Sequence, residues 1–460
     1  MAANITKKPI SEFLDTDYLN YAKYIVEHRA IPSVIDGFKP TARKVIYVAN
    51  RVWNGKGNGK PIKVFQLGGK VSSEAFYHHG EAGLNGTIIT MAQSFKNNMP
   101  LLQKDGQFGV LRNPAPGAPR YIGVSLHKNF AALYTDFELL NPQFEEGYEI
   151  EPEYFLPVIP TVLLNGSSGI AVGFATSILN RHPLDLINAC IKCLNDEEIP
   201  NLLPWNPEFS GTVVKDPYEL RRYIFRGKYE VKNTTDVLVT ELPPSMTFEK
   251  YETYLNKLVE EKKFIYDYDN NSKKGQISYL VKFRREELAA LQKKGDLLKA
   301  LKLEESDTDN LTTLDEFGKV KVFDKTSDLV KYFVNFRLSF YQKRKDYLIN
   351  KIEHEILVLT NKARFIKFII EGKIKINNIP KAQIVEQLTT HKFDKINSSY
   401  DYLLAMPIHS LTKEKYEELL KQLEEKKVEL EDTKKLIPKK MYQLDLTDLK
   451  KEVEKDFNKI

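Results

Sequence analysis

The chain has 460 residues, of which 42% are hydrophobic, enough for two to four domains that each bury a core. No apolar run approaches the roughly 20 residues that are needed to span a bilayer. The first ten residues also lack the apolar stretch of a secretory signal. These features exclude a secreted or membrane protein, and we expect a cytoplasmic, intracellular one.

The formal net charge is only +6, but it is distributed unevenly along the chain. Residues 1–140 contain 17 Lys and Arg against 10 Asp and Glu, a net charge of +7, so that the remaining residues are close to neutral. Positive charge gathered in one region indicates a polyanionic partner there. The alternative, an ordinary solvated surface, stays open at this level.

The basic region is expected to be helical. After an N-terminal helical arm within residues 1–25, apolar residues at helical spacing predict three short helices, at residues 40–52, 69–78 and 83–95. Pro40 suits the first turn of the first of these helices, and residues 54–61 form a basic, glycine-rich loop. This combination is typical of a winged-helix or helix-turn-helix DNA-binding domain, which we assign to residues 1–140.

The pattern changes after residue 140. Residues 141–325 alternate strand-like runs with helical stretches, which predicts a separate α/β domain; the strands are expected at residues 155–164, 210–214, 236–242 and 277–283, and a helix at 248–261. Residues 326–460 predict two long helices, the second at 413–435, separated by a small globule. This indicates an antiparallel coiled-coil arm with a knob, although a plain helical bundle is the alternative. The whole chain is therefore an α+β multidomain protein.

Four segments give a more specific indication. They are residues 29–45 (RAIPSVIDGFKPTARKV), residues 63–70 (KVFQLGGK) with 77–81 (YHHGE), residues 107–109 (QFG) with 119–121 (PRY), and residues 164–173 (LNGSSGIAVG). In this order and spacing they resemble the breakage–reunion region of type IIA DNA topoisomerases. The second segment is closer to the eukaryotic enzymes than to bacterial gyrase. The resemblance extends to residues 361–366 and 402–407 and so covers nearly the whole chain.

The resemblance implies that Tyr121 attacks the DNA backbone and forms a 5′-phosphotyrosyl link, so that a second duplex can pass through a transient double-strand break. Among 24 tyrosines, one beside an arginine is not unusual without this context. A tyrosine with a pKa near 10 needs help to ionise. Arg120 stays protonated and cannot be the base, but it can stabilise the phenolate and the negative phosphate. The resemblance adds Arg29 and His79 to the catalytic group.

Further residues are expected to bind DNA. Lys39, Arg43, Lys44 and Lys70 are cations of the kind that bind phosphate, with ordinary surface charge as the alternative. His78 is assigned to the same surface. Asp36 is expected to orient an arginine. By resemblance, Ile170 wedges between base pairs and bends the duplex, whereas a buried turn isoleucine is the alternative.

By resemblance, residues 1–140 are the winged-helix cleavage domain, 141–325 the tower domain, and 326–460 the coiled-coil arm with a C-gate dimerisation globule. Two copies would pair by two-fold symmetry. The chain opens almost directly on the tyrosine domain and ends without a DNA-wrapping domain. We therefore expect relaxation or decatenation, a pattern most like the separate cleavage subunits of the T-even-type phage branch.

The sequence offers no metal site or nucleotide site of its own. Asp15 with Asp17 and Asp267 with Asp269 are formal D-x-D pairs but read as surface charge, and Cys190 and Cys193 read as ordinary helix cysteines. A P-loop is absent from the sequence. Mg²⁺ and ATP are therefore expected on a partner subunit that carries the ATPase and the acidic metal-binding domain. Two other classes stay open, a non-catalytic winged-helix regulator or architectural protein, and a coiled-coil scaffold.

Overall fold

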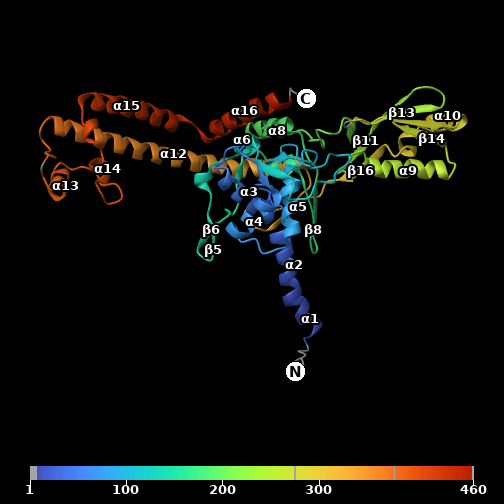
Figure 1. Cartoon of the computed structure of the whole chain (residues 1–460), viewed down its shortest axis with the longest axis horizontal. Coiled ribbons are helices and arrows are strands. Elements are labelled where there is room, and N and C mark those ends of the chain that lie inside the picture. The colour runs from blue at the N-terminus through green and yellow to red at the C-terminus, as the bar shows by residue number, and fades with distance from the viewer. Residues whose placement is uncertain (1–7, 274–275, 378, 458–460) are drawn as a thin grey trace. The chain divides into compact units, whose positions relative to one another are not determined.

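The computed structural model describes residues 8–273, 276–377 and 379–457. The chain is divided into two compact units. The first unit comprises Met1–Arg337 with Gln443–Ile460, and the second comprises Leu338–Tyr442. Both helices and strands are present, as Figure 1 shows, so the mixed α and β composition that the sequence predicts is confirmed. None of the helices within the described ranges combines the length and the apolar character of a membrane span.

The first unit begins with a helical arm from Ile10 to Ala30, in which α1 (Ile10–Phe13) and α2 (Leu19–Ile25) alternate with two π-helical turns. Three helices follow. Helix α3 (Pro40–Val52) has the bounds that the sequence predicts, with Pro40 at its start. Helix α5 (Glu81–Ala92) also lies close to its predicted position.

Helix α4 (Val64–Glu74) begins five residues before the predicted start at residue 69. The main-chain N–H of Lys63 donates to Oε1 of Gln66 at 3.0 Å and so caps the start of the helix, a signal that the glycine pair at 68 and 69 obscures. Gly68 has a packing role, because a Cβ atom there would lie 2.8 Å from Oδ1 of Asn85 in α5. The glycine therefore permits close contact between α4 and α5 rather than ending a helix.

A small antiparallel sheet stands beside these helices, in the order β1 (Ile62–Lys63), β3 (Gly123–Leu126) and β2 (Leu102–Asp105). Strands β2 and β3 pair from Leu102 opposite Leu126 to Asp105 opposite Gly123. Residues 106–122 are thus a long loop between two paired strands, and we call this segment loop 106–122. It carries Tyr121 near its return to the sheet.

The prediction of a strand over residues 155–164 is wrong for most of its length. A two-residue strand, β7 (Leu156–Pro157), is followed by helix α7 (Thr161–Asn165). Proline lacks the N–H that a strand donates to its neighbour, so Pro157 and Pro160 interrupt any longer ladder. The chain then forms a hairpin from β8 (Ser167–Ile170) and β9 (Ala175–Ile178).

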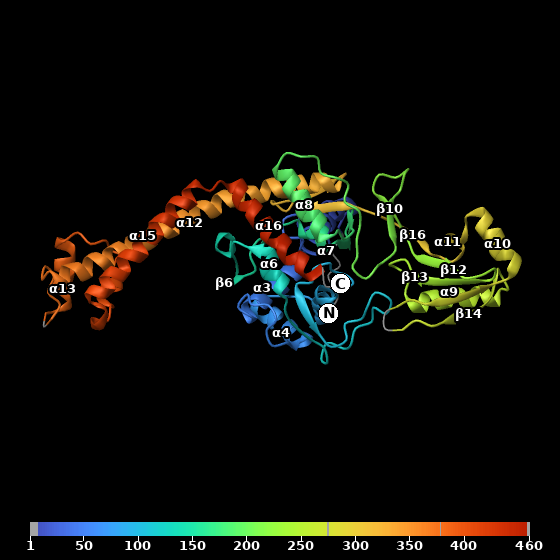
Figure 2. The same ribbon diagram turned by 90° about the horizontal axis from the view of Figure 1, so that it is seen from above.

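Residues 212–308 contain two further sheets, and we call them the sheet region. The larger sheet has the order β12 (Lys228–Val231), β13 (Asp236–Glu241), β15 (Tyr279–Phe283) and β14 (Ile265–Asn270). Helix α9 (Phe248–Glu260) lies along this sheet in Figure 2, and its Tyr251, Leu255 and Leu258 share a core with Val237 and Val281. The smaller sheet has the order β10 (Thr212–Lys215), β11 (Arg222–Arg226) and β16 (Glu304–Thr308).

The remaining elements of the first unit are shorter or lie at its margins: α6 (Lys128–Leu133), β4 (Tyr134–Thr135), β5 (Gln143–Glu145), β6 (Tyr148–Ile150), α8 (Pro183–Leu194), α10 (Arg285–Lys294), α11 (Leu297–Ala300), β17 (Leu311–Leu314) and β18 (Val320–Phe323). Helix α16 (Pro438–Phe457) returns to α8, where Gln443 donates to Asn195. Cys190 is buried in α8 and Cys193 is half-buried, which fits ordinary helix residues.

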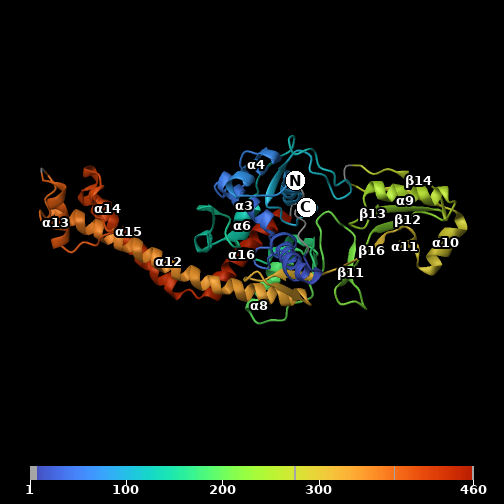
Figure 3. The same cartoon turned by 90° about the horizontal axis from the view of Figure 1, so that it is seen from below.

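The second unit contains most of the long helix α12 (Thr326–Ile370) and the helix α15 (Lys413–Lys435), which has the predicted bounds. Leu419 packs on Ala363 and Ile366, and ion pairs join Lys426 to Glu355 and Lys434 to Glu353. These contacts make the two helices antiparallel, as Figure 3 shows. Exposed ion pairs contribute little, so the apolar contacts are the main source of stability.

A small apolar core lies at the end of this helix pair, with α13 (Lys381–Thr390) and α14 (Asp401–Leu404) around it. Phe365, Leu388 and Phe393 are among its buried members. The buried Asn361 of α12 donates to Asp394 at 3.0 Å and so fixes the loop after α13 to the long helix. The two helices and this globule occupy the residues from which the sequence predicts an arm with a knob.

Candidate functional site

The side chain of Tyr121 is 71% exposed at the end of loop 106–122, but its main chain is held firmly. Its N–H donates to the carbonyl of Ala118 at 2.9 Å, and its carbonyl accepts from Nζ of Lys63 at 2.8 Å. The first turn of α4 is joined to the same stretch, since Val64 N donates to the Ile122 carbonyl. An exposed aromatic ring on a fixed backbone is suited to contact with a ligand rather than to the core.

Arg120 lies beside this ring, with its guanidinium carbon 5.5 Å from the ring centroid of Tyr121. Both side chains are exposed. A guanidinium stays charged at any physiological pH, so it favours a negative charge on the phenol oxygen or on a phosphate bound next to it. The pair can therefore act as a nucleophile with an adjacent cation.

Arg29 and Lys39 line a cavity of about 810 Å³ together with the start of the β8–β9 hairpin. Nζ of Lys39 donates to the Ser168 carbonyl at 2.7 Å, and burial lowers the pKa of this lysine. Gly169 is required at this point, because a Cβ atom there would lie 2.2 Å from the carbonyl oxygen of Ala30. Lys39 therefore ties the hairpin to the start of α3, and Gly169 lets it pack against the end of the N-terminal helical arm.

Ile170 is 89% exposed at the end of β8, next to the turn of the hairpin. The base of the hairpin is fixed, because Ser177 and Asn310 exchange backbone hydrogen bonds and Leu179 N donates to Asp309. Asp309 in turn pairs with the fully buried Arg181. The alternative of a buried turn isoleucine is excluded, and an exposed aliphatic side chain on an anchored hairpin is found instead.

His79 and His78 are both exposed but have different partners. Nε2 of His79 lies 2.9 Å from Oη of Tyr24 in α2, and its ring packs edge-on against Tyr77. Nε2 of His78 lies 3.0 Å from the Glu145 carboxylate of β5. The predicted catalytic residues thus have different neighbours: Tyr121 lies beside Arg120, His79 beside Tyr24, and Arg29 at the cavity.

Arg43 and Lys44 do not present their charges as the sequence led us to expect. The buried guanidinium of Arg43 donates to Asp36 from Nε at 2.7 Å and from Nη2 at 3.1 Å. Lys44 is largely buried and pairs with Glu151 at 3.0 Å, and it also donates to the Ala75 carbonyl. Contact with DNA would break these pairs, so the predicted DNA-binding role of both residues is not supported. Asp36 does orient an arginine, as predicted.

Lys70 is the exposed member of the predicted cationic set and makes only a loose pair with Glu74, at 3.6 Å. Sequence reasoning overlooked Lys63, which holds the Tyr121 carbonyl, although it is the first residue of the second motif segment. It also overlooked Tyr24, which contacts His79 without any signal in the local sequence. A third overlooked residue is Arg112, which is buried although it belongs to loop 106–122.

Among the described residues, the acidic side chains do not form a site for a divalent cation. Within the described ranges, no group of three or more His, Cys, Asp or Glu side chains is placed to hold a metal ion. Asp267 and Asp269 both pair with Lys282, and Asp17 pairs with Lys8. Mg²⁺ prefers a set of oxygen ligands that includes carboxylates, and the described residues near Tyr121 do not fit that requirement.

Comparison with known proteins adds to this geometry. Residues 29–450 match the family model for the A-type subunit of DNA gyrase/topoisomerase IV. The DNA topoisomerase medium subunit of Enterobacteria phage T4 is 34% identical, over 97% of this chain and 100% of its own length. The mitochondrial DNA topoisomerase 2 of Dictyostelium discoideum is 32% identical over 96% of this chain. This chain spans only about a third of that protein, 35%.

Among solved structures, the DNA-binding, cleavage and re-ligation domain of Plasmodium falciparum topoisomerase II is similar, with a TM-score of 0.87. The two sequences are 32% identical, and the match covers 97% of this chain and 65% of the other.

Proposed function

Because the chain belongs to the DNA gyrase/topoisomerase IV family of type IIA breakage–reunion subunits, we propose that it cleaves and reseals duplex DNA with Tyr121 as the nucleophile. The observation that carries the proposal is the exposed phenol of Tyr121, which is held on a fixed main chain beside the Arg120 guanidinium.

The chemistry is an exchange of one phosphate ester for another. The phenol oxygen of Tyr121 loses its proton and attacks the phosphorus, the bond to the 3′ oxygen breaks, and that oxygen takes up a proton as it leaves. The DNA 5′ end is then an ester of Tyr121. Because the ester is retained, the 3′ hydroxyl can attack it in the reverse step and reseal the strand. Arg120 stabilises negative charge on the phenol oxygen and on the crowded phosphate.

The cavity and the hairpin supply a surface for the DNA. Arg29, Lys39 and Lys70 would contact phosphates, and His78 and His79 would lie along the same duplex. Ile170 would enter between base pairs, since an aliphatic wedge on a fixed hairpin can exchange base stacking for a bent and more extensive contact.

Ile170→Ala is expected to reduce DNA bending with little effect on folding. An exposed side chain contributes within about 0.5 kcal/mol to stability, whereas the loss of a wedge removes a bending angle of tens of degrees. The bend can be measured by energy transfer between dyes at the two ends of a short duplex. Val322→Ala, at another exposed aliphatic residue of the first unit, is the matched control. A full bend with the Ile170 variant would refute the wedge.

We further propose the domain roles that the family suggests: cleavage for residues 1–140, a tower for 141–325, and an arm with a dimerisation globule for 326–460. The relative from phage T4 is named a medium subunit. We therefore propose that this chain works as a homodimer with a second kind of subunit that binds ATP and supplies the acidic ligands for Mg²⁺. Relaxation or decatenation would be the outcome of the complete assembly.

The decisive experiment mixes the chain with the proposed partner subunit, Mg²⁺ and supercoiled DNA, and then denatures the protein with detergent. A covalent protein–DNA adduct whose DNA-linked peptide contains Tyr121 supports the proposal. If every metal and partner condition yields tight DNA binding but no adduct, the chain is a DNA-binding regulator instead, and the proposed cleavage is wrong.

A further inference from the structure

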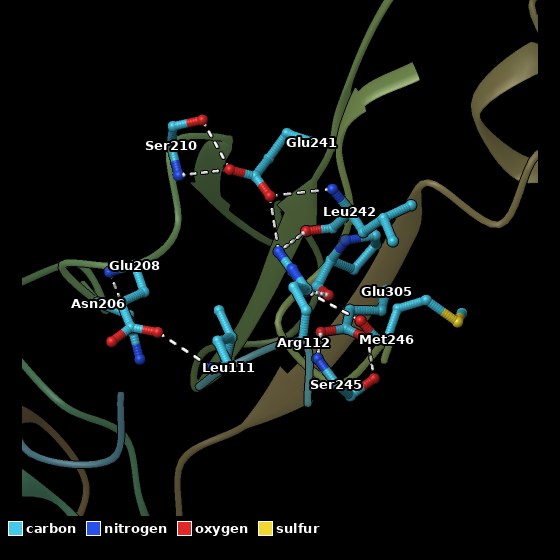
Figure 4. A network of polar contacts seen from close by, with 11 residues as sticks. Leu111, Arg112, Asn206, Glu208, Ser210, Glu241, Leu242, Ser245, Met246 and Glu305 are labelled. Atoms are coloured by element: carbon cyan, nitrogen blue, oxygen red, sulfur yellow. Dashed lines mark hydrogen bonds and ion pairs between the residues drawn. The ribbon is translucent and has the colours of Figure 1, made fainter. Parts of the chain in front are cut away.

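Arg112 lies at the tip of loop 106–122 and is only 5% exposed, although it belongs to a surface loop. Its Nη1 donates to the carbonyls of Pro243 at 2.6 Å and Met246 at 3.0 Å. Its Nη2 donates to the Leu242 carbonyl and to the Glu241 carboxylate, the latter at 2.6 Å. Figure 4 shows these bonds converging on the guanidinium. All four acceptors belong to residues 241–246, which run from the last residue of strand β13 into the loop before helix α9 of the sheet region.

Glu241, which accepts from Arg112, is itself held by other hydrogen bonds. Glu241 is buried, and its second oxygen accepts from both N and Oγ of Ser210, at 2.9 and 2.7 Å. Its first oxygen also accepts from Leu242 N. Burial lowers the pKa of Arg112, and the negative charge of Glu241 opposes that effect. The guanidinium remains charged, because its ordinary pKa is far above physiological pH. The carboxylate therefore has fixed partners and cannot follow the loop if the loop moves.

Two further hydrogen bonds hold the tip of loop 106–122 in place. The carbonyl of Arg112 accepts from Phe248 N at 3.2 Å, at the start of α9. Leu111 N donates to the Glu208 carboxylate at 3.0 Å, as Figure 4 also shows. Val110 and Asn113 exchange backbone hydrogen bonds, so Arg112 sits within a closed turn. The tip is thus a rigid turn that is docked on the sheet region.

The chain between this tip and Tyr121 has little freedom. Residues 113–120 contain Pro114, Pro116 and Pro119, and each proline fixes its own φ angle at about −65°. Gly117 N donates to the Gln107 carbonyl at 2.8 Å and joins the returning strand of the loop to the outgoing one. Because this segment of eight residues is stiff, a displacement of the loop tip at Arg112 is transmitted to Tyr121. The position of the tip therefore constrains the position of Tyr121.

We propose that Arg112 is a positioning residue, which holds Tyr121 in place for attack on DNA by anchoring loop 106–122 to residues 241–246. The inference rests on the proposed cleavage function and assigns to the sheet region a part in that reaction. The anchor acts before the covalent bond forms. Once Tyr121 is esterified, the DNA itself holds the tyrosine, so the resealing step depends less on Arg112.

This asymmetry gives the test. Arg112→Ala is expected to slow cleavage by about 100-fold, the order of loss that a misplaced reacting group causes. The rate of resealing, measured from preformed adduct, should stay within about twofold. DNA affinity should also be unchanged, because Arg112 is buried. Arg112→Lys keeps one charged partner for Glu241 but fewer donors, and is expected to give an intermediate cleavage rate.

Arg226→Ala is the matched control, because it removes an ion pair with Glu304 in the sheet region without touching the loop. Hydrogen exchange gives a readout that needs no activity. The amides of Asn113 and Gly117 should exchange faster in Arg112→Ala than in the wild type, and at the wild-type rate in Arg226→Ala.

Three results would overturn the inference. Equal slowing of cleavage and resealing would mean that Arg112 stabilises the transition state directly, since both steps share it. Loss of DNA binding in parallel with cleavage, in both Arg112 variants, would mean a merely structural role. Unchanged cleavage in Arg112→Ala would show that the anchor is irrelevant to Tyr121. A wild-type chain that forms no adduct at Tyr121 would overturn the proposed function itself and is thereby distinguished from these results.

Discussion

Tyr121→Phe is expected to abolish the covalent protein–DNA adduct while DNA affinity stays within about twofold of the wild type. The substitution removes only the phenol oxygen. The ring remains, with its contact to Arg120, and the Lys63 bond to the main-chain carbonyl does not depend on the side chain. Adduct is measured after detergent denaturation of a mixture that contains Mg²⁺ together with the partner subunit. Affinity is measured by the fluorescence anisotropy of a labelled duplex.

Tyr218→Phe is the matched control for this experiment. Tyr218 is also an exposed tyrosine of the first unit, at 94%, but it belongs to the loop between β10 and β11. The same oxygen is removed there, and the adduct should form at the wild-type level. An adduct that persists in Tyr121→Phe would move the nucleophile to another residue. Loss of adduct in both variants would indicate a general effect of losing a surface phenol.

Elements with strong local signals could be predicted closely from the sequence. Helix α3 begins at Pro40, and α15 (Lys413–Lys435) follows Thr412, whose hydroxyl accepts from Lys415 N as an N-cap. Proline at a first turn and threonine at an N-cap act through neighbouring residues only, so they can be recognised without a fold. The central strands of the sheet region are equally clear, because β13 alternates buried and less buried residues.

For residues 155–164 the sequence predicts burial correctly but not the backbone conformation. Their apolar side chains are buried, as a strand in a core would require. A short apolar run does not distinguish a buried strand from a buried helical turn, and here α7 (Thr161–Asn165) takes the last four of the ten residues. Burial was therefore predictable from composition, whereas the backbone conformation depended on the proline positions and on the surrounding chain.

Only part of the candidate site could likewise be predicted from the sequence. Tyr121 was found through a motif, and no local property of the sequence distinguishes it from the other tyrosines. Arg43 and Lys70 are alike in the sequence as cations near helices, yet one is buried against Asp36 and the other is exposed. Only the folded chain places a buried carboxylate beside Arg43, whereas the Glu74 carboxylate near Lys70 is partly exposed. Arg112 had no signal at all, since three of its four acceptors are backbone carbonyls about 130 residues away.

The burial of Arg43 leads to a second large expected effect, on stability rather than on activity. Asp36 is fully buried, and its carboxylate accepts from Arg43 twice, from Phe38 N at 3.0 Å and from Phe155 N at 3.1 Å. Asp36→Ala removes the carboxylate that pairs directly with a buried guanidinium, so we expect the free energy of unfolding to fall by about 3–5 kcal/mol. Both tryptophans, Trp53 and Trp205, lie in the first unit, so tryptophan fluorescence in a urea titration reports on that unit.

Two further variants separate the ion pair from the general loss of a carboxylate. Asp267→Ala removes an exposed partner of Lys282 and should cost at most about 1 kcal/mol. Arg43→Met should cost less than Asp36→Ala, because Asp36 would keep its two backbone donors. A loss of less than about 1 kcal/mol in Asp36→Ala would mean that the guanidinium reaches solvent at little cost. In the wild type, Arg43 could then leave Asp36 at little cost. The predicted contact between Arg43 and a DNA phosphate would be supported again.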